Sequence, residues 1–166
     1  MKTRRITEFG MLLAISLVLT YLEMLIPVMV AVPGVKLGLA NIVTMLLLYK
    51  RNLRDTFFFM TIRVVLAGLL FSGVSGIIYS FAGGVCCIGI MSILKRFPMF
   101  SIMGVSMSGA IFHNIGQILV AIFVIENIHI LYYLPVLCIT GTITGFLIGY
   151  ITFLLIKKYN QIIFWD

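Results

Sequence analysis

The sequence predicts an all-α polytopic membrane protein, a single domain over residues 1–166 built as a bundle of six transmembrane helices. Of the 166 residues, 62% are hydrophobic and 10% are charged, and the mean hydropathy is +1.20. A water-soluble fold of this length could not hide so much apolar surface, and about 20 apolar residues cross the hydrocarbon core as one helix. Strands of alternating hydropathy, which would indicate an outer-membrane barrel, do not occur.

The first three helices follow from breaks in the apolar pattern. The run 6–26 has the length of one span and stops at a proline, which cannot continue a helix. The run 37–49 is short, so we expect it to be tilted little or to be shielded by its neighbours. The run 56–74 starts beside Asp55 and Thr56, either of which is available as its N-cap.

The last three helices are bounded by small and basic residues. Ser75 and Gly76 mark a tight turn into the run 76–94, which ends at a basic segment. The run 101–125 and the run 131–156 follow, and the latter ends at a pair of lysines. An even number of spans places both termini on one side of the membrane.

The basic residues predict which side that is. Ten of the twelve lysines and arginines fall on the side of the termini: Lys2, Arg4, Arg5, Lys50, Arg51, Arg54, Lys95, Arg96, Lys157 and Lys158. Loops rich in lysine and arginine face the cytoplasm. We therefore expect a bacterial inner-membrane protein with cytoplasmic termini, surrounded by membrane lipids, with Lys36 on the outer side. The basic residues are divided among helix ends, so no nucleic-acid partner is expected.

A glycine-bearing turn is the first candidate site. In Pro33–Asn41, Gly38 permits close backbone approach, and Lys36 would lie near a helix N-terminus. A lysine and unsatisfied backbone N–H groups favour an anionic ligand group. The alternative is a structural turn whose lysine meets lipid headgroups.

A polar stretch within the fifth run is the second candidate site. His113 and Gln117 are four residues apart and share one helix face, with Asn114 beside them. Groups at this membrane depth need partners, so the stretch either holds helices together by hydrogen bonds or forms the polar wall of a ligand cavity. We favour the cavity.

Other polar residues admit two interpretations each. Arg63 lies inside the third run and either reaches the cytoplasmic surface or turns inward to a carboxylate or an anionic ligand. Glu23, Glu126 and His129 lie near outer helix ends, where they contact headgroups or, with Lys36, line the mouth of a pocket.

The sequence predicts no catalytic residues, no metal site and no cofactor. Its five acidic residues are scattered, and the nucleotide-binding and hydrolase motifs are missing. We therefore expect a protein that is not an enzyme. In the last run, Gly141, Gly145 and Gly149 recur four apart, a spacing that serves close packing inside the monomer or docking of another membrane subunit.

The segment 33–43 together with the stretch 113–117 resembles the Gx transporter family, also named heptaprenyl diphosphate synthase component I, and the resemblance covers about residues 5–158. This family is similar in size and six-helix layout to the substrate-binding S components of energy-coupling-factor (ECF) transporters. The resemblance implies a small anionic or polar-headed ligand taken from the outer side. It places Lys36, Gly38 and Asn41 in a ligand gate. It places His113, Asn114 and Gln117 in the cavity.

The same resemblance implies two sets of partners. As an S component, the chain would bind a membrane coupling subunit that carries an ATPase module. Under the second family name, it would be a non-catalytic accessory subunit in isoprenoid or quinone supply, or in flavin- or quinone-linked electron transfer, with prenyl-pathway or redox proteins as partners. The aspartate-rich DDxxD motifs of prenyl diphosphate synthases are missing, because the chain has two aspartates in total, Asp55 and Asp166.

Overall fold

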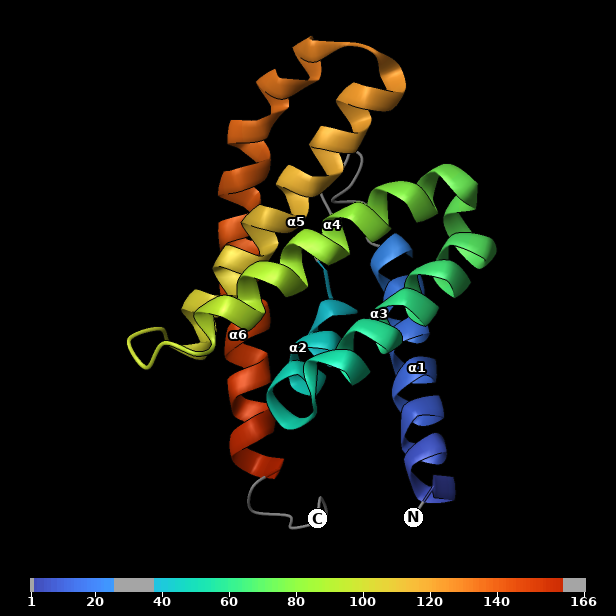
Figure 1. Cartoon of the computed structure of the whole chain (residues 1–166), viewed down its shortest axis with the longest axis vertical. Helices are drawn as coiled ribbons and strands as arrows, with labels where there is room; N and C mark the ends of the chain where they lie inside the picture. Colours follow the sequence, from blue (N-terminus) through green and yellow to red (C-terminus); the bar gives the residue numbers. More distant parts are fainter. Residues whose placement is uncertain (1, 26–37, 160–166) are drawn as a thin grey trace.

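The structure, a computed structural model, describes residues 2–25 and 38–159, and the regular elements among them are all helices (Figure 1). The six α-helices are α1 (Lys2–Leu25), α2 (Asn41–Lys50), α3 (Leu53–Ala67), α4 (Gly73–Leu94), α5 (Ile102–Ile125) and α6 (Leu134–Tyr159). A π-helical turn, Gly68–Ser72, joins α3 to α4, and a 3₁₀ helix, Ile128–Tyr133, precedes α6. The predicted all-α class is confirmed for this part of the chain.

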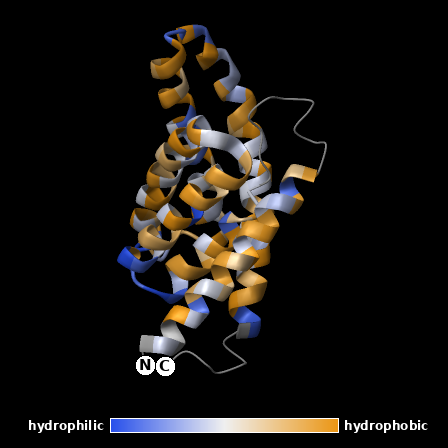
Figure 2. Ribbon diagram, turned by 90° about the vertical axis from the view of Figure 1, so that its right-hand side faces the viewer, coloured by the Kyte–Doolittle hydropathy of each residue, from blue (hydrophilic) through white to orange (hydrophobic). Residues whose placement is uncertain are grey.

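The helices have the length and composition of membrane spans. Four stretches of the described chain are long and apolar enough to cross a bilayer: Ile6–Leu25, Leu53–Leu94, Ile102–Ile125 and Ile128–Lys158. Hydrophobic residues cover most of the length of the bundle, whereas hydrophilic residues lie mainly toward its two ends, with a few inside (Figure 2). The chain is therefore a membrane protein.

The longest of these stretches, Leu53–Leu94, folds back on itself as a hairpin of α3 and α4 (Figure 1). The rings of Phe57 and Phe81 lie 6.3 Å apart, although they belong to the start of α3 and the middle of α4. Near the turn, a Cβ placed on Gly68 would lie only 2.0 Å from Cγ1 of Ile77. Close packing of the two helices therefore depends on a residue without a side chain at this position.

The hairpin turns earlier than the sequence predicts. Gly73 follows the π-helical turn with φ 73° and ψ −177°, a conformation that side chains disfavour. The predicted turn at Ser75 and Gly76 is therefore wrong in position, since both residues already belong to α4. Gly73 and Gly76 are both able to make a tight turn, and the sequence alone does not indicate which of them does so.

Two helix starts also differ from prediction. α2 begins at Asn41, later than predicted, because Gly38 takes a positive φ of 74° and its carbonyl oxygen accepts from the Asn41 N–H at 2.8 Å in a turn. The N-cap of α3 is Asn52, with extended backbone, whereas Asp55 and Thr56 lie within the first turns of the helix. The prediction that one of these two residues caps the helix is therefore wrong.

The last two helices start at capped or restricted positions. Ser101 is the N-cap of α5, and its hydroxyl oxygen accepts from the Gly104 N–H at 3.1 Å. α6 starts after the 3₁₀ helix, so the predicted run 131–156 begins within that helix. Pro135 lies in the first turn of α6, where its missing N–H has no intrahelical partner to lose.

The basic segments meet at one end of the bundle, which we call the basic end. Arg51, between α2 and α3, donates to Oε2 of Glu8 in α1 at 2.8 Å. Lys95, after α4, donates to the carbonyl oxygen of Leu48 at 2.5 Å, and partial burial lowers the pKa of this ammonium. The start of α1 and the end of α6 lie at the same end (Figure 1).

α2 is the most enclosed helix of the bundle. Six of its ten residues are buried, and Met45 and Leu48 pack in one apolar core with Met60 of α3 and Val105 of α5. A ten-residue helix spans about 15 Å, half the hydrocarbon thickness of a bilayer. Of the two arrangements expected for this short run, the structure shows the one in which its neighbours shield it.

The glycine series of α6 packs inside the molecule. A Cβ on Gly145 would lie 2.8 Å from Cα of Met107, and one on Gly149 would lie 2.8 Å from Cα of Met103. Both methionines belong to α5, so the two backbones are in direct contact. This face is therefore occupied by α5 and is not free to dock another subunit.

We expect Gly145→Ala to destabilise the α5 and α6 pair, because the added methyl group would overlap with the backbone of α5. Overpacking of this kind costs about 1–3 kcal/mol. Gly89→Ala is the matched control, because Gly89 is an exposed helical glycine with nothing within 4 Å of an added Cβ. Thermal unfolding in mild detergent should show a lower Tm for the first variant and an unchanged or higher Tm for the second. Equal Tm values would contradict the packing.

A polar cavity at the start of α2

A polar cavity of about 100 Å³ lies inside the bundle, and all six α-helices contribute to its lining. It is found at the N-terminal end of α2, about 15 Å of helix away from the basic end. Its polar lining residues are Thr20, Glu23, Asn41, Arg63, Ser72, Ser80, His113, Asn114, Gln117 and Thr144. The cavity thus gathers polar groups at the depth where an apolar bundle can least solvate them.

Irregular backbone reaches this depth at the entry to α2. Gly38 precedes the turn and lines the cavity, and a Cβ placed on it would lie 3.1 Å from Cδ1 of Ile148. Ile148 lies near the middle of α6, so the turn is beside the centre of a spanning helix. Non-helical backbone at membrane depth is tolerated where it lines a cavity. The N-terminus of α2, with its partial positive charge, therefore adjoins the cavity.

Two buried side chains of opposite charge line the cavity. Glu23 is 6% exposed, and its Oε1 accepts from the Gly38 N–H at 2.5 Å. Arg63 is 8% exposed, and its Nη2 donates to Oδ1 of Asn41 at 3.1 Å. A buried ion costs several kcal/mol of desolvation, so each charge needs such partners. Of the two orientations expected for Arg63, the structure shows the inward one.

α5 supplies the opposite wall. Nδ2 of Asn114 donates to the carbonyl oxygen of Leu137 at 2.7 Å, and a Cβ on Gly141 would lie 2.7 Å from the same nitrogen. The missing side chain at Gly141 thus leaves the space that the amide fills. The sequence suggested either a hydrogen bond between helices or the wall of a cavity for this stretch. Asn114 fits both, since it binds α5 to α6 and also lines the cavity.

His113 and Gln117 lie against α4. A Cβ on Gly83 would approach Cε1 of His113 at 2.9 Å and Cγ of Gln117 at 3.0 Å. Both side chains line the cavity, and they share one face of α5, as their spacing predicts. A glycine on α4 therefore makes room for the two polar side chains where the helices meet.

The structure brings together the predicted site residues that it describes. Six of them line the one cavity: Gly38, Asn41, Arg63, His113, Asn114 and Gln117. Lys36 lies outside the described residues. Their role in ligand binding remains a prediction, whereas their common location is a property of the fold.

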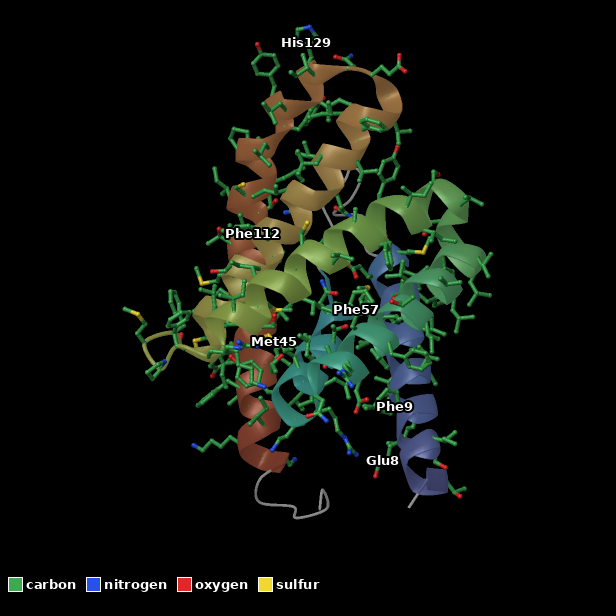
Figure 3. All side chains as sticks on the ribbon, viewed as in Figure 1. Glu8, Phe9, Met45, Phe57, Phe112 and His129 are labelled. Carbon is green, nitrogen blue, oxygen red and sulfur yellow. The ribbon has the colours of Figure 1, made fainter. Side chains whose placement is uncertain are left out.

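Glu23, Glu126 and His129, the three residues expected near outer helix ends, lie in different parts of the structure. Glu23 is buried in the cavity. His129 lies at the tip of the hairpin of α5 and α6, far from the cavity, where its ring stacks on Tyr132 at 5.9 Å (Figure 3). Glu126 is exposed next to that tip with φ 53°. Glu126 and His129 therefore do not line the mouth of this cavity.

The sequence did not predict four of the polar residues that line the cavity. Thr20 and Thr144 look like ordinary helix hydroxyls, and each donates to a carbonyl of its own helix, at 2.9 and 3.3 Å. Thr20 is three residues before Glu23 and thus on the same helix face, which is the signal that could have found it. Ser72 and Ser80 also line the cavity, and nothing in the local sequence distinguishes them from other small residues.

The cavity suits a small polar group. Its volume of about 100 Å³ has room for several water molecules or a small polar group. It offers a guanidinium, the positive end of a short helix, amide groups and one carboxylate, which together can bind an anionic or polar group by charge-assisted hydrogen bonds. Among the residues that the structure describes, no group of three or more His, Cys, Asp or Glu side chains is placed to hold a metal ion.

The fold and the cavity define a class of protein, a helical membrane protein with a buried polar cavity at the start of a half-length helix. The chain belongs to the family described as heptaprenyl diphosphate synthase component I, whose model matches residues 12–155. The family indicated by the sequence resemblance is thereby confirmed. Comparison with curated proteins and with solved structures gave no match.

We expect Asn41→Leu to destabilise the protein, because it removes the oxygen that accepts from Arg63 and leaves part of a buried charge unsatisfied. The loss of a hydrogen bond to a charged group costs about 1.5–3 kcal/mol. Asn41→Asp keeps an acceptor of similar size and places its added charge next to the guanidinium of Arg63, so it should lose less stability than the leucine variant. Thermal unfolding in detergent compares the three proteins. Equal stability of the leucine variant would show that this contact does not hold the charge.

Proposed function

We propose that this protein binds a small anionic or polar-headed molecule from the outer side of the membrane and presents or passes it inward, in the manner of an ECF-type S component. One observation carries the proposal: polar side chains from all six helices face one cavity inside an apolar bundle. Polar groups at membrane depth are costly and mark ligand pathways more often than plain structure.

The character of the ligand follows from the charges around the cavity. Arg63 and the N-terminus of α2 both favour a negative group, and His113 adds a side chain that can gain a proton. Glu23 balances part of this positive charge, which accommodates a zwitterionic or uncharged polar head as well. We place Lys36 and Gly38 at the gate of the site.

The orientation belongs to the same proposal. We place the basic end in the cytoplasm of a bacterial cell, because positively charged loops face inward. The start of α1 and the end of α6 then lie on the cytoplasmic side, and the cavity lies in the outer half of the bilayer. On this proposal α3, α4 and the half-length α2 count as separate membrane segments beside α1, α5 and α6, which makes six.

Transport would require an external source of energy. The sequence has no nucleotide-binding motif, so ATP would be hydrolysed by a partner, an ATPase module that works through a membrane coupling subunit. The glycine face of α6 is covered by α5, so such a subunit would bind elsewhere on the bundle.

A second candidate function rests on the family. The family description names a component of heptaprenyl diphosphate synthase, and a component can act without being catalytic. On this alternative, the chain is a membrane accessory subunit for prenyl-pathway enzymes, or for a flavin- or quinone-linked redox system, and has a structural cavity.

Native mass spectrometry of the detergent-purified protein tests the first proposal. We expect a bound small molecule on wild type. Its occupancy should fall by about tenfold in the double variant Lys36→Ala and His113→Ala, since lost hydrogen bonds to a charged group reduce affinity by at least this factor. The matched control is Lys158→Ala with His129→Ala, which changes the same residue types at exposed positions outside the cavity.

The same spectra distinguish the two candidates. A ligand kept by the control and lost by the double variant supports binding in the cavity, and an associated ATPase module identifies a transporter subunit. An empty protein that carries a soluble prenyl synthase or a redox protein supports the accessory role and contradicts the first proposal. Equal uptake by cells with wild type and the double variant, at matched protein levels, would also contradict it.

A further inference from the structure

α4 and α5 cross where two glycines meet. A Cβ on Gly116 would lie 3.0 Å from Cα of Gly83 and 2.9 Å from the carbonyl oxygen of Ala82, so the two backbones are in contact. Beyond this contact, toward the start of α4 and the end of α5, the two helices diverge (Figure 1). The space between them must be filled by side chains, by lipid or by a ligand.

This space is an apolar groove of about 530 Å³. α4 contributes Tyr79 and Ser80, and the 3₁₀ helix and α6 close one side with Tyr133 and Leu137. α5 contributes one face of its last turns, which includes Ala121. Gly76 of α4 and Ala121 of α5 also line the groove, and their small size leaves most of its volume open.

The polar cavity and the apolar groove are adjacent. Ser80 and Gln117 line both of them, one from each of the crossing helices. Gln117 also lies against Gly83 at the crossing itself. Polar residues therefore fill one side of this boundary and apolar residues the other.

We propose that the cavity and the groove form one binding site for an amphipathic molecule, with its small polar head in the cavity and a single apolar chain in the groove. This inference rests on the proposed function and names the class of its ligand. The cavity alone, at about 100 Å³, is smaller than the usual range of ligand sites, about 300–1,000 Å³, whereas the groove lies within that range. A head that fills the cavity thus leaves the rest of the molecule in the groove.

Chemistry on the two sides agrees with this assignment. Arg63 and the start of α2 favour an anionic head such as a phosphate or a carboxylate. Ile118, Leu137 and the aromatic rings of Tyr79 and Tyr133 favour hydrocarbon. When the molecule enters from the bilayer, its apolar chain would pass from lipid to the apolar groove. Only its polar head would lose contact with water and gain contact with protein.

Photo-crosslinking in lipid nanodiscs tests the site. The probe is decyl monophosphate with a diazirine at the end of its chain. On wild type we expect labels on the groove peptides that contain Tyr79, Ala121 and Tyr133. An excess of unlabelled decyl monophosphate should remove these labels, whereas decanol, which lacks the charged head, should leave them in place.

Ala121→Trp fills the groove and should reduce these labels by about tenfold. Ile125→Trp fills it from an exposed position and serves if the first variant is unstable. Phe123→Trp is the matched control, since Phe123 is 87% exposed on the same helix and does not line the groove. Labels spread equally over all exposed helix faces, or unchanged in both groove variants, would overturn the inference.

The inference and the proposed function fail in different ways. A co-purified single-chain molecule that is lost in the groove variants supports both. A small ligand without a chain, bound equally to wild type and the groove variants, overturns the inference and leaves the proposed function standing. A two-chain bilayer phospholipid in the groove also overturns the inference. No bound molecule and no specific label would overturn both.

Discussion

The solvation of one buried guanidinium constrains the centre of this molecule. Arg63 lies in an apolar bundle, and a charge at that depth requires hydrogen-bond acceptors within reach. Asn41 is one acceptor, and it is in place because α2 begins in mid-bundle. The turn before α2 is held in turn by Glu23, which accepts from the Gly38 N–H. α1, α2 and α3 therefore share one polar network around the cavity.

Close helix approach is the second condition for this arrangement. Glycines take the positions where a side chain would overlap with a neighbouring backbone, at Gly83 and Gly116 for α4 and α5, and at Gly145 and Gly149 for α5 and α6. In a bilayer, hydrophobic burial does not hold helices together, so such contacts and interhelical hydrogen bonds must do so. Gly83 also leaves the space for His113 and Gln117, and Gly141 leaves the space for Asn114.

The sequence predicted the class and the composition of the cavity better than its details. Apolar runs fix long helices reliably, and the spacing of His113 and Gln117 fixes their common face. The turn into α4 was misplaced because Gly73 and Gly76 offer the same local signal and tertiary packing selects between them. The inward position of Glu23 depended on a contact with Gly38 across the bundle, which no local pattern contains.

We propose one site for one molecule, formed by a half-length helix, a buried polar network and an adjoining apolar groove. An experimental density map of the protein, purified from its own membrane in nanodiscs, tests this most directly. We expect non-protein density that touches Arg63 and passes Gln117 into the space between α4 and α5. Protein side chains that fill both spaces, with Arg63 turned to the membrane surface, would contradict the account.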